Sequence, residues 1–284
     1  MTEGYIQGEV KAWVDQNTPG VGGAVEAGDQ FGWDVAVSPT HLIVGAPFED
    51  TVSNTAIDAG GALVFRHDTT PEGWPTYLTW LDQADTFING AAETGDRFGF
   101  SVAAVDYWQS GQSLEEVETL FAVSSPWEDF AANPVLEAGV VSLIKRSSSG
   151  VYSNAGYYHQ EGSSLGDTNE NYDHLGANLE LVNLAPDRPA TNSTLHLVIA
   201  VPDENNADNN DGLVHITGVA APANGIDTVL THPEPVPNGM LGTGLGYTTD
   251  RLYLAGAGTG GLYSFDWAQA SPGTTQTPDT VAMP

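Results

Sequence analysis

The sequence predicts an all-β fold, a β-propeller of four blades with four strands each, closed by the N-terminal strand. Short runs rich in β-branched and aromatic residues alternate with turns rich in glycine, proline, asparagine and aspartate, a pattern typical of strands. No sustained 3.6-residue periodicity indicates long helices. A group of strands recurs along the chain, and repeated four-stranded units are typical of propeller blades.

The repeats are anchored by glycines that follow a large apolar residue. These anchors are Gly32, Gly99, Gly176 and Gly242, which are 67, 77 and 66 residues apart. The apolar runs expected to form the second strands are 42–47, 120–126, 197–202 and 252–258. A glycine-led run for the third strand follows at 61–65, 139–144, 212–216 and 261–265. The runs 77–81, 156–159 and 228–230 complete a four-stranded sheet in the first three units.

The units define the boundaries of the predicted domain. It spans 1–267, with blades at 28–83, 95–162, 173–231 and 239–266. The last unit lacks a fourth strand, and an orphan apolar run at 8–14 precedes the first unit. Pairing this run with the last blade would close the ring and leave no strand edge exposed. The segment 268–284, rich in proline, threonine and glutamine, is expected to be an extended tail without strands.

The repeated motif has a packing explanation. Its residues in the first two units are Phe31, Gly32, Gly45, Ala46, Pro47, Phe98 and Gly99. The two phenylalanines are expected to lie buried between blades, and the glycines after them allow close approach of backbones. Proline ends a strand where no further ladder donor is needed. Asp29 and Asp96, two residues before each phenylalanine, are placed to cap nearby backbone N–H groups.

The pairing of Phe-Gly with Gly-Ala-Pro resembles the FG-GAP repeat of integrin α-subunit propellers, and most closely the short bacterial and archaeal form. The resemblance covers about residues 8–266 and is clearest in the first two units. It implies a propeller used for adhesion or binding, often with calcium in the blade loops, rather than an enzyme. Integrin propellers have seven blades, whereas this chain has room for about four.

The composition excludes several classes of protein. The chain has 284 residues, 7 Lys+Arg and 37 Asp+Glu, so its formal net charge is −30. Nucleic-acid binding is not expected, because contacts to phosphates need Lys and Arg. The absence of Cys excludes disulfides and thiolate metal sites. The apolar runs are too short for membrane insertion, and the segment from Met1 to Tyr5 lacks the features of a signal peptide.

The acidity also points to a salt-rich environment. Lysine occurs only at Lys11 and Lys145, and the carboxylates are dispersed along the chain. Self-repulsion at this charge is considerable at low ionic strength, whereas molar salt shortens the Debye length to about 3 Å and screens it. This pattern favours a protein from a halophile. The alternative is an ordinary acidic marine or secreted protein.

Acidic residues recur in the loops that follow the second strands, and they are candidate metal ligands. The candidates are Asp203, Asn205, Asp208 and Asp211 in the third unit and, more weakly, Glu49, Asp50 and Asp58 in the first. Hard cations take several oxygen ligands, so Ca²⁺, or Mg²⁺ in its place, is the cofactor to expect. The alternative is a solvated acidic turn, and no catalytic or other cofactor-binding residue is assigned.

Aromatic residues outside the repeats are candidates for a binding surface. Tyr107 and Trp108 lie in an insertion of the second unit, and Trp74 precedes the fourth strand of the first. Exposed aromatic side chains stack on sugars or anchor a protein partner. The alternative is that these side chains cover blade edges.

These features favour a non-enzymatic binding or structural propeller. The first hypothesis is a virion surface or tail protein of a virus that infects a halophile, acting in host attachment or particle decoration. Its partners would be a protein or glycan on a cell surface, or other virion proteins, and a homo-oligomer is compatible with the sequence. The second hypothesis is a secreted or cell-surface calcium-binding adhesion module of a halophilic microbe. Both hypotheses place the protein on a virion surface or outside the cell.

Overall fold

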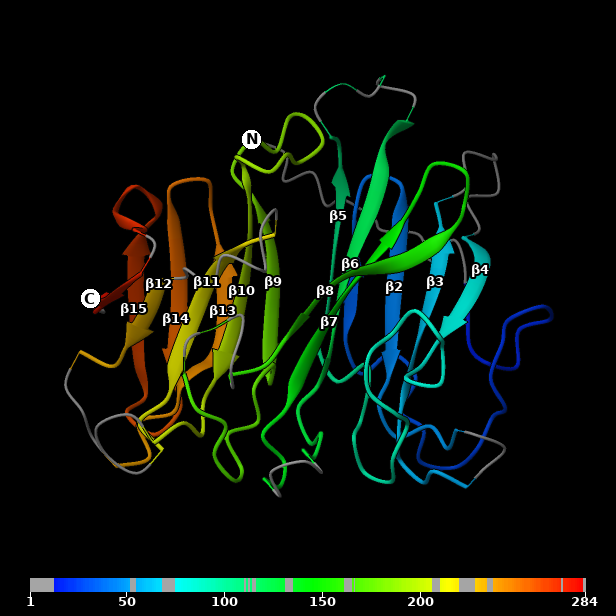
Figure 1. Cartoon of the computed structure of the whole chain (residues 1–284), viewed down its shortest axis with the longest axis horizontal. Coiled ribbons are helices and arrows are strands. Elements are labelled where there is room, and N and C mark those ends of the chain that lie inside the picture. Colours follow the sequence, from blue (N-terminus) through cyan, green and yellow to red (C-terminus); the bar gives the residue numbers. More distant parts are fainter. Residues whose placement is uncertain are drawn as a thin grey trace, which may run out of the picture.

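The architecture is a four-bladed β-propeller (Figure 1). The computed structural model describes residues 13–51, 55–67, 75–109, 111, 113, 116–130, 135–160, 165, 167–205, 210–219, 228–233, 237–271 and 273–282. The four sheets follow one another in sequence order. The strands run roughly vertically in Figure 1, with blade 1 in blue and cyan on the right and blade 4 in orange and red on the left. The predicted fold class is therefore confirmed.

The first two blades each contain four antiparallel strands in sequence order. Blade 1 consists of β1 (Val35–Val37), β2 (His41–Ala46), β3 (Gly61–Arg66) and β4 (Thr76–Leu81). Blade 2 consists of β5 (Val102–Tyr107), β6 (Glu118–Ser125), β7 (Val140–Arg146) and β8 (Tyr152–Tyr158). All eight residues of β6 are buried. A strand covered on both faces needs a continuous apolar run, which is why the second strands lack polar alternation.

The last two blades each recruit a strand from the C-terminal segment. Blade 3 contains β9 (Asn178–Asn183), β10 (Leu195–Val201), β11 (Leu213–Gly218), β12 (Thr228–Thr231) and, parallel to β12, β16 (Thr274–Gln276). Blade 4 contains β13 (Leu241–Tyr247), β14 (Arg251–Gly256), β15 (Gly261–Asp266) and β17 (Asp279–Thr280). A 3₁₀ turn, η3 (Trp267–Gln269), leads from β15 into this segment.

The expectation that the tail lacks strands is wrong. Strand β16 pairs with β12, and β17 pairs with β15. Composition suggested a segment without strands that extends over a surface or a partner, but the open edges of two blades supply backbone partners that composition does not report. The tail thus provides the outermost strands of blades 3 and 4.

The predicted closing strand at 8–14 falls mostly outside the described residues. Trp13 and Val14 are described and form no strand. Val14 packs with Val21 against the apolar cluster of blade 1 rather than against blade 4. The edge of β15 that this strand was expected to fill is occupied by β17.

Two successive N–H groups of the repeated motif bond in different directions, the first to the preceding blade and the second within its own blade. The Phe98 N–H donates to the carbonyl of Ala59 in blade 1 (2.8 Å), and the next N–H, of Gly99, donates to Ser124 in its own blade (2.9 Å). Leu175 and Gly176 repeat both bonds, to Ala138 and to Ala200 (2.9 Å each). Leu241 repeats the first, to Asp211 (3.0 Å). We call this arrangement the blade joint.

The blade joint explains which motif residues are buried. Phe98 is 1% exposed and lies in a core shared by blades 1 and 2. Phe31, which was also expected to be buried between blades, is only half-buried and packs on blade 1 alone. Gly45, Ala46 and Pro47 are buried at the end of β2. Phe31 differs because it opens the first unit, so no preceding unit in the chain supplies the other half of its joint.

A second link between blades runs through side chains at the centre. The second residue after each anchor glycine is Asp34, Ser101, Asn178 or Gly244. Asp34 accepts from the Ser101 hydroxyl (3.1 Å), and that hydroxyl accepts from the Leu179 N–H (3.1 Å). Asn178 donates to the Gly242 carbonyl (3.0 Å). The series ends in blade 4, where Gly244 has no side chain to offer.

No helix among the described residues is long and apolar enough to cross a membrane.

Replacing Gly99 by alanine should strongly destabilise the protein. A Cβ atom at Gly99 would lie 2.2 Å from the Gly61 carbonyl oxygen, and the residue has φ +89°. The close contact and the positive φ both involve the backbone, which cannot move aside as a flexible side chain can. We therefore expect a loss of about 3 kcal/mol or more in the free energy of unfolding. Chemical denaturation followed by circular dichroism measures this loss.

Gly95→Ala is the matched control. Gly95 has φ +96°, but a Cβ atom there would meet nothing within 4 Å. The Gly95→Ala variant should lose only the free energy of unfolding that corresponds to backbone strain, about 1 to 2 kcal/mol. Equal losses in the two variants would show that the close approach at the blade joint does not limit stability.

Candidate functional site

Three similar carboxylate clusters lie beside the blade joints, in the loops before the first strand and after the second strand of blades 1 to 3. Each contains one glutamine, one aspartate and two glutamates. Cluster 1 is Gln16, Glu26, Asp29 and Glu49; cluster 2 is Gln83, Glu93, Asp96 and Glu128; cluster 3 is Gln160, Glu170, Asp173 and Glu204. The glutamine, the first glutamate and the aspartate repeat at the same intervals of 67 and 77 residues as the first three anchor glycines.

The aspartates cap the turn before the motif, as the sequence predicts. Asp29 accepts a hydrogen bond from the Glu26 N–H, and Asp96 accepts one from the Glu93 N–H, both at 2.6 Å. Asp173 does the same for Glu170, also at 2.6 Å. Each aspartate is buried, so the cap places a carboxylate inside the protein.

The glutamates that follow the second strands are also buried, and each is bound by a glutamine. Gln16 donates to Glu49 and Gln83 donates to Glu128, both at 2.6 Å. Gln160 donates to Glu204 in the same way. Sequence reasoning missed the glutamines, although their spacing matched that of the anchor glycines. These pairs connect the loop that enters each blade to the loop after its second strand.

Burial makes these carboxylates hard to ionise. It raises the pKa of Glu128 to about 7, and together with the charge of Glu128 it raises the pKa of Asp96 to about 8. Burial likewise raises the pKa of Glu49 to about 7. In cluster 3, burial and the charges of neighbouring acids raise the pKa of Asp173 to about 6 and that of Glu204 to about 8. The clusters are therefore electrostatically costly when fully charged.

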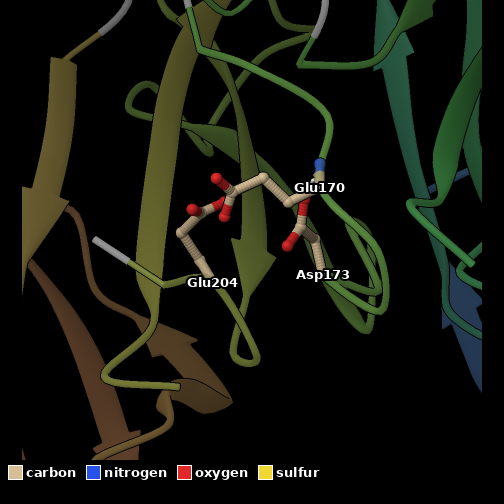
Figure 2. Close-up of side chains that lie close together, drawn as sticks. All are labelled: Glu170, Asp173 and Glu204. Atoms are coloured by element: carbon tan, nitrogen blue, oxygen red, sulfur yellow. Dashed lines mark hydrogen bonds between the residues drawn. The ribbon is translucent and has the colours of Figure 1, made fainter. Parts of the chain in front are cut away.

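Cluster 3 brings its carboxylates closest together. Glu170, Asp173 and Glu204 each offer a ligand oxygen, and these atoms all lie within 4.8 Å of one another. Figure 2 shows the three side chains converging from two loops. Among the described residues, this is the one group of three or more His, Cys, Asp or Glu that meets this distance.

The predicted ligands of the third loop lie around this cluster but have other partners. Asp203 contacts Nδ1 of His174 (2.8 Å), whose Nε2 contacts Glu137 (3.1 Å). Burial lowers the pKa of His174, but the hydrogen bonds to these two carboxylates outweigh it and raise the pKa overall. Asn205 accepts from the Asn210 N–H (3.0 Å). Asp211 is buried, and Asp208 lies outside the described residues.

The predicted ligands of the first loop have local roles as well. Asp50 accepts from the Asp58 N–H (2.9 Å), as Asp129 does from the Glu137 N–H in blade 2 (2.7 Å). Asp58 and Glu137 both have positive φ, 53° and 52°. The recurring acids therefore cap a left-handed residue in each loop. Of these first-loop residues, Glu49 belongs to a carboxylate cluster.

Of the three aromatic residues predicted to form a binding surface, Tyr107 is buried. Tyr107 is 6% exposed, and its hydroxyl donates to Asn192 in blade 3. The expectation that it contacts a partner is therefore wrong, because it fills the junction between blades 2 and 3. Trp108 is half-buried, and its backbone N–H donates to the Ala190 carbonyl (2.8 Å). Trp74 lies outside the described residues.

A different row of aromatic side chains crosses blades 1 and 2 beside the clusters. The ring centroids of Trp33 and Phe100 are 5.3 Å apart, those of Phe100 and Trp127 are 4.7 Å apart, and Phe48 lies 5.9 Å from Trp33. The Arg97 guanidinium lies over Phe48 (4.9 Å) and Trp127 (4.1 Å). Trp33 is 49% exposed. We call these five residues the aromatic row.

The centre of the propeller is hollow. Two cavities of about 350 and 330 Å³ share Val37, Ala104, Leu181 and Tyr247, one residue from each innermost strand. Glu180 of β9 lines the second cavity, and burial together with the charge of Asp34 raises the pKa of Glu180 to about 7. The cavity walls combine apolar strand residues with polar ones such as Ser101, Asn178 and Asp106.

Glu128→Gln should stabilise the protein at alkaline pH. The pKa of Glu128 is raised in the folded state, so its stabilising contribution is present below the ordinary pKa and is lost as the pH rises through about 7. We expect the variant to exceed the wild type by about 1 to 3 kcal/mol at about pH 9 and to match it near about pH 5. Urea unfolding at both pH values measures the difference.

Glu116→Gln serves as the control, since Glu116 is exposed and lies outside the clusters. It removes one negative charge without changing a buried group. If both variants stabilise the protein equally, the effect comes from net charge rather than from the buried carboxylate.

Comparisons with known proteins bear on the fold and the repeat. Residues 23–65 match the family model for the FG-GAP repeat. No curated protein matches the sequence. Among solved structures, a complex of KlAtg21 with the coiled-coil of AgAtg16 is 10% identical, covering 88% of this chain and 69% of that one with a TM-score of 0.33, too low to support a functional argument. The family resemblance is confirmed: the chain carries an FG-GAP repeat within a four-bladed β-propeller.

Proposed function

We propose that the protein is a non-enzymatic binding propeller on the surface or tail of a virus that infects a halophile, where it attaches to the host or decorates the particle. The aromatic row carries this proposal. Trp33 is half exposed and packs against the rings of Phe48 and Phe100, so an apolar surface is held in place beside the Arg97 guanidinium over Phe48. Such surfaces suit the faces of sugar rings and the apolar side chains of protein partners.

The family supports the coarser part of this proposal. FG-GAP propellers generally serve in binding or as structural parts and are typically extracellular, and residues 23–65 match the repeat. The structure adds a body in which consecutive blades are fixed by backbone hydrogen bonds. A rigid body with variable loops is suited to holding a binding surface in place.

The halophilic source rests on charge. Most of the 37 Asp+Glu have no Lys or Arg to balance them, since these number 7. We expect the midpoint of thermal unfolding to rise from about 0.1 M to about 2 M KCl as repulsion is screened. Circular dichroism measures it, and NaCl and KCl should act alike. An unchanged midpoint would contradict the halophilic assignment.

The location is tested on purified virus particles by mass spectrometry. We expect the chain in intact particles and in host cells late in infection. Its restriction to cell extracts or to the envelope of uninfected cells would overturn the virion proposal. In that case the alternative, a calcium-binding adhesion module of a halophilic microbe, would explain the same fold and surface.

The binding role of the aromatic row is tested by measuring binding of the purified protein to host cells. Fluorescent wild-type protein and a Trp33→Ala variant are compared for binding to intact cells. Loss of binding with an unchanged thermal midpoint supports a contact role for the exposed ring. Trp13→Ala is the matched control, because Trp13 is 78% exposed and is not part of the row. Equal binding by all three proteins would rule out the row as the contact surface.

A further inference from the structure

We propose that cluster 3 binds a divalent cation, with Ca²⁺ the best fit, through carboxylate oxygens of Glu170, Asp173 and Glu204 and the amide oxygen of Gln160. This site differs from the loop ligands predicted from the sequence, since it joins the loop before β9 to the loop after β10. It does not depend on the proposed function and would exist in a virion protein or a cellular one alike.

The distances suit a cation of this size. The ligand oxygens of the three acids lie within 4.8 Å of one another. Ca²⁺ takes oxygens at about 2.3 to 2.6 Å, so two of its ligands are at most about 5 Å apart. Figure 2 shows the carboxylates turned toward a common space. A single ion can therefore reach all three.

Two fully buried side chains of cluster 3 have an oxygen that lacks a hydrogen-bond partner. Asp173 and Gln160 are both 0% exposed. Asp173 uses Oδ2 to accept from the Glu170 N–H, while its Oδ1 has no partner. Gln160 uses its amide nitrogen on Glu204, while Oε1, on the same carbon, has none. Buried polar atoms are almost always satisfied, and a cation between them would satisfy both.

The charges also call for a cation. Three carboxylates converge, and no described Lys or Arg forms an ion pair with any of them. The nearby His174 is held by Asp203 and Glu137 instead. A bound divalent ion would neutralise most of this local charge, which oxygen ligands from the protein alone cannot do.

Comparison with the other blades explains why cluster 3 is proposed as the cation site. Clusters 1 and 2 keep the same residue types, but their acids do not meet the distance that cluster 3 meets. In blade 4 the residue two before the motif leucine is Gly239, where blade 3 has Asp173. Cluster 2 therefore provides a matched set of control positions with the same local hydrogen bonds.

The test is calcium binding by isothermal titration calorimetry on the full chain, stripped with EDTA, with choline chloride at equal ionic strength as the reference. Glu170→Gln and Asp173→Asn each remove one charged ligand, and asparagine can still accept from the Glu170 N–H. We expect both substitutions to weaken Ca²⁺ binding by about tenfold or more. Even the substitution of a residue that only hydrogen-bonds to a metal ligand typically lowers metal affinity by about 10- to 100-fold.

Glu93→Gln and Asp96→Asn are the matched controls in cluster 2. Glu93 is exposed like Glu170, and Asp96 makes the same backbone bond as Asp173. Both should bind Ca²⁺ like the wild type. The proposal is overturned if the wild type responds to Ca²⁺ no more than to choline, or if both cluster 3 variants bind normally. It is also overturned if the cluster 2 variants lose binding equally. Glu170 is exposed, so its variant gives a result even if Asp173→Asn fails to fold.

Discussion

The blade joint is the constraint on which the rest of the molecule depends. The N–H of Phe98, Leu175 or Leu241 donates to the preceding blade, and in blades 2 and 3 the next N–H donates within its own blade. Two hydrogen bonds in succession leave the backbone no freedom to shift sideways. This is why glycine stands at the closest approach, where Gly99 faces the Gly61 carbonyl, and why large apolar residues precede it.

Several acidic residues have structural roles beside the blade joint. To bring the third strand up to the joint, the chain passes through a left-handed residue such as Asp58 or Glu137. Asp50 and Asp129 then cap those turns. Other acids, such as Glu49 and Glu128, are buried beside the joint and held by glutamines. Of the loop residues that the sequence suggested as metal ligands, Asp50 and Asn205 accept hydrogen bonds from backbone N–H groups of their own loops.

The sequence predicted the fold well because local sequence patterns that recur along the chain indicate it. Anchor glycines and apolar runs recur, so four sheets and most strands could be expected. Pairings of segments that carry no such signal could not, and β16 and β17 were missed for that reason. Tyr107 was misjudged because burial depends on a neighbour, Asn192, that lies 85 residues away in sequence. Cluster 3 requires Gln160 and Glu204 to meet, and only the folded chain brings them together.

The side-chain series from Asp34 through Ser101 and Asn178 stops at Gly244. The assembly thus has a direction, with a beginning and an end, unlike a symmetric wheel. Blades 2 and 3 each have a linked neighbour on both sides in this series, whereas blade 1 is linked only to the blade that follows it and blade 4 only to the blade before it. Among the described residues, no link of this series joins blade 4 back to blade 1, so closure of the ring rests on other contacts.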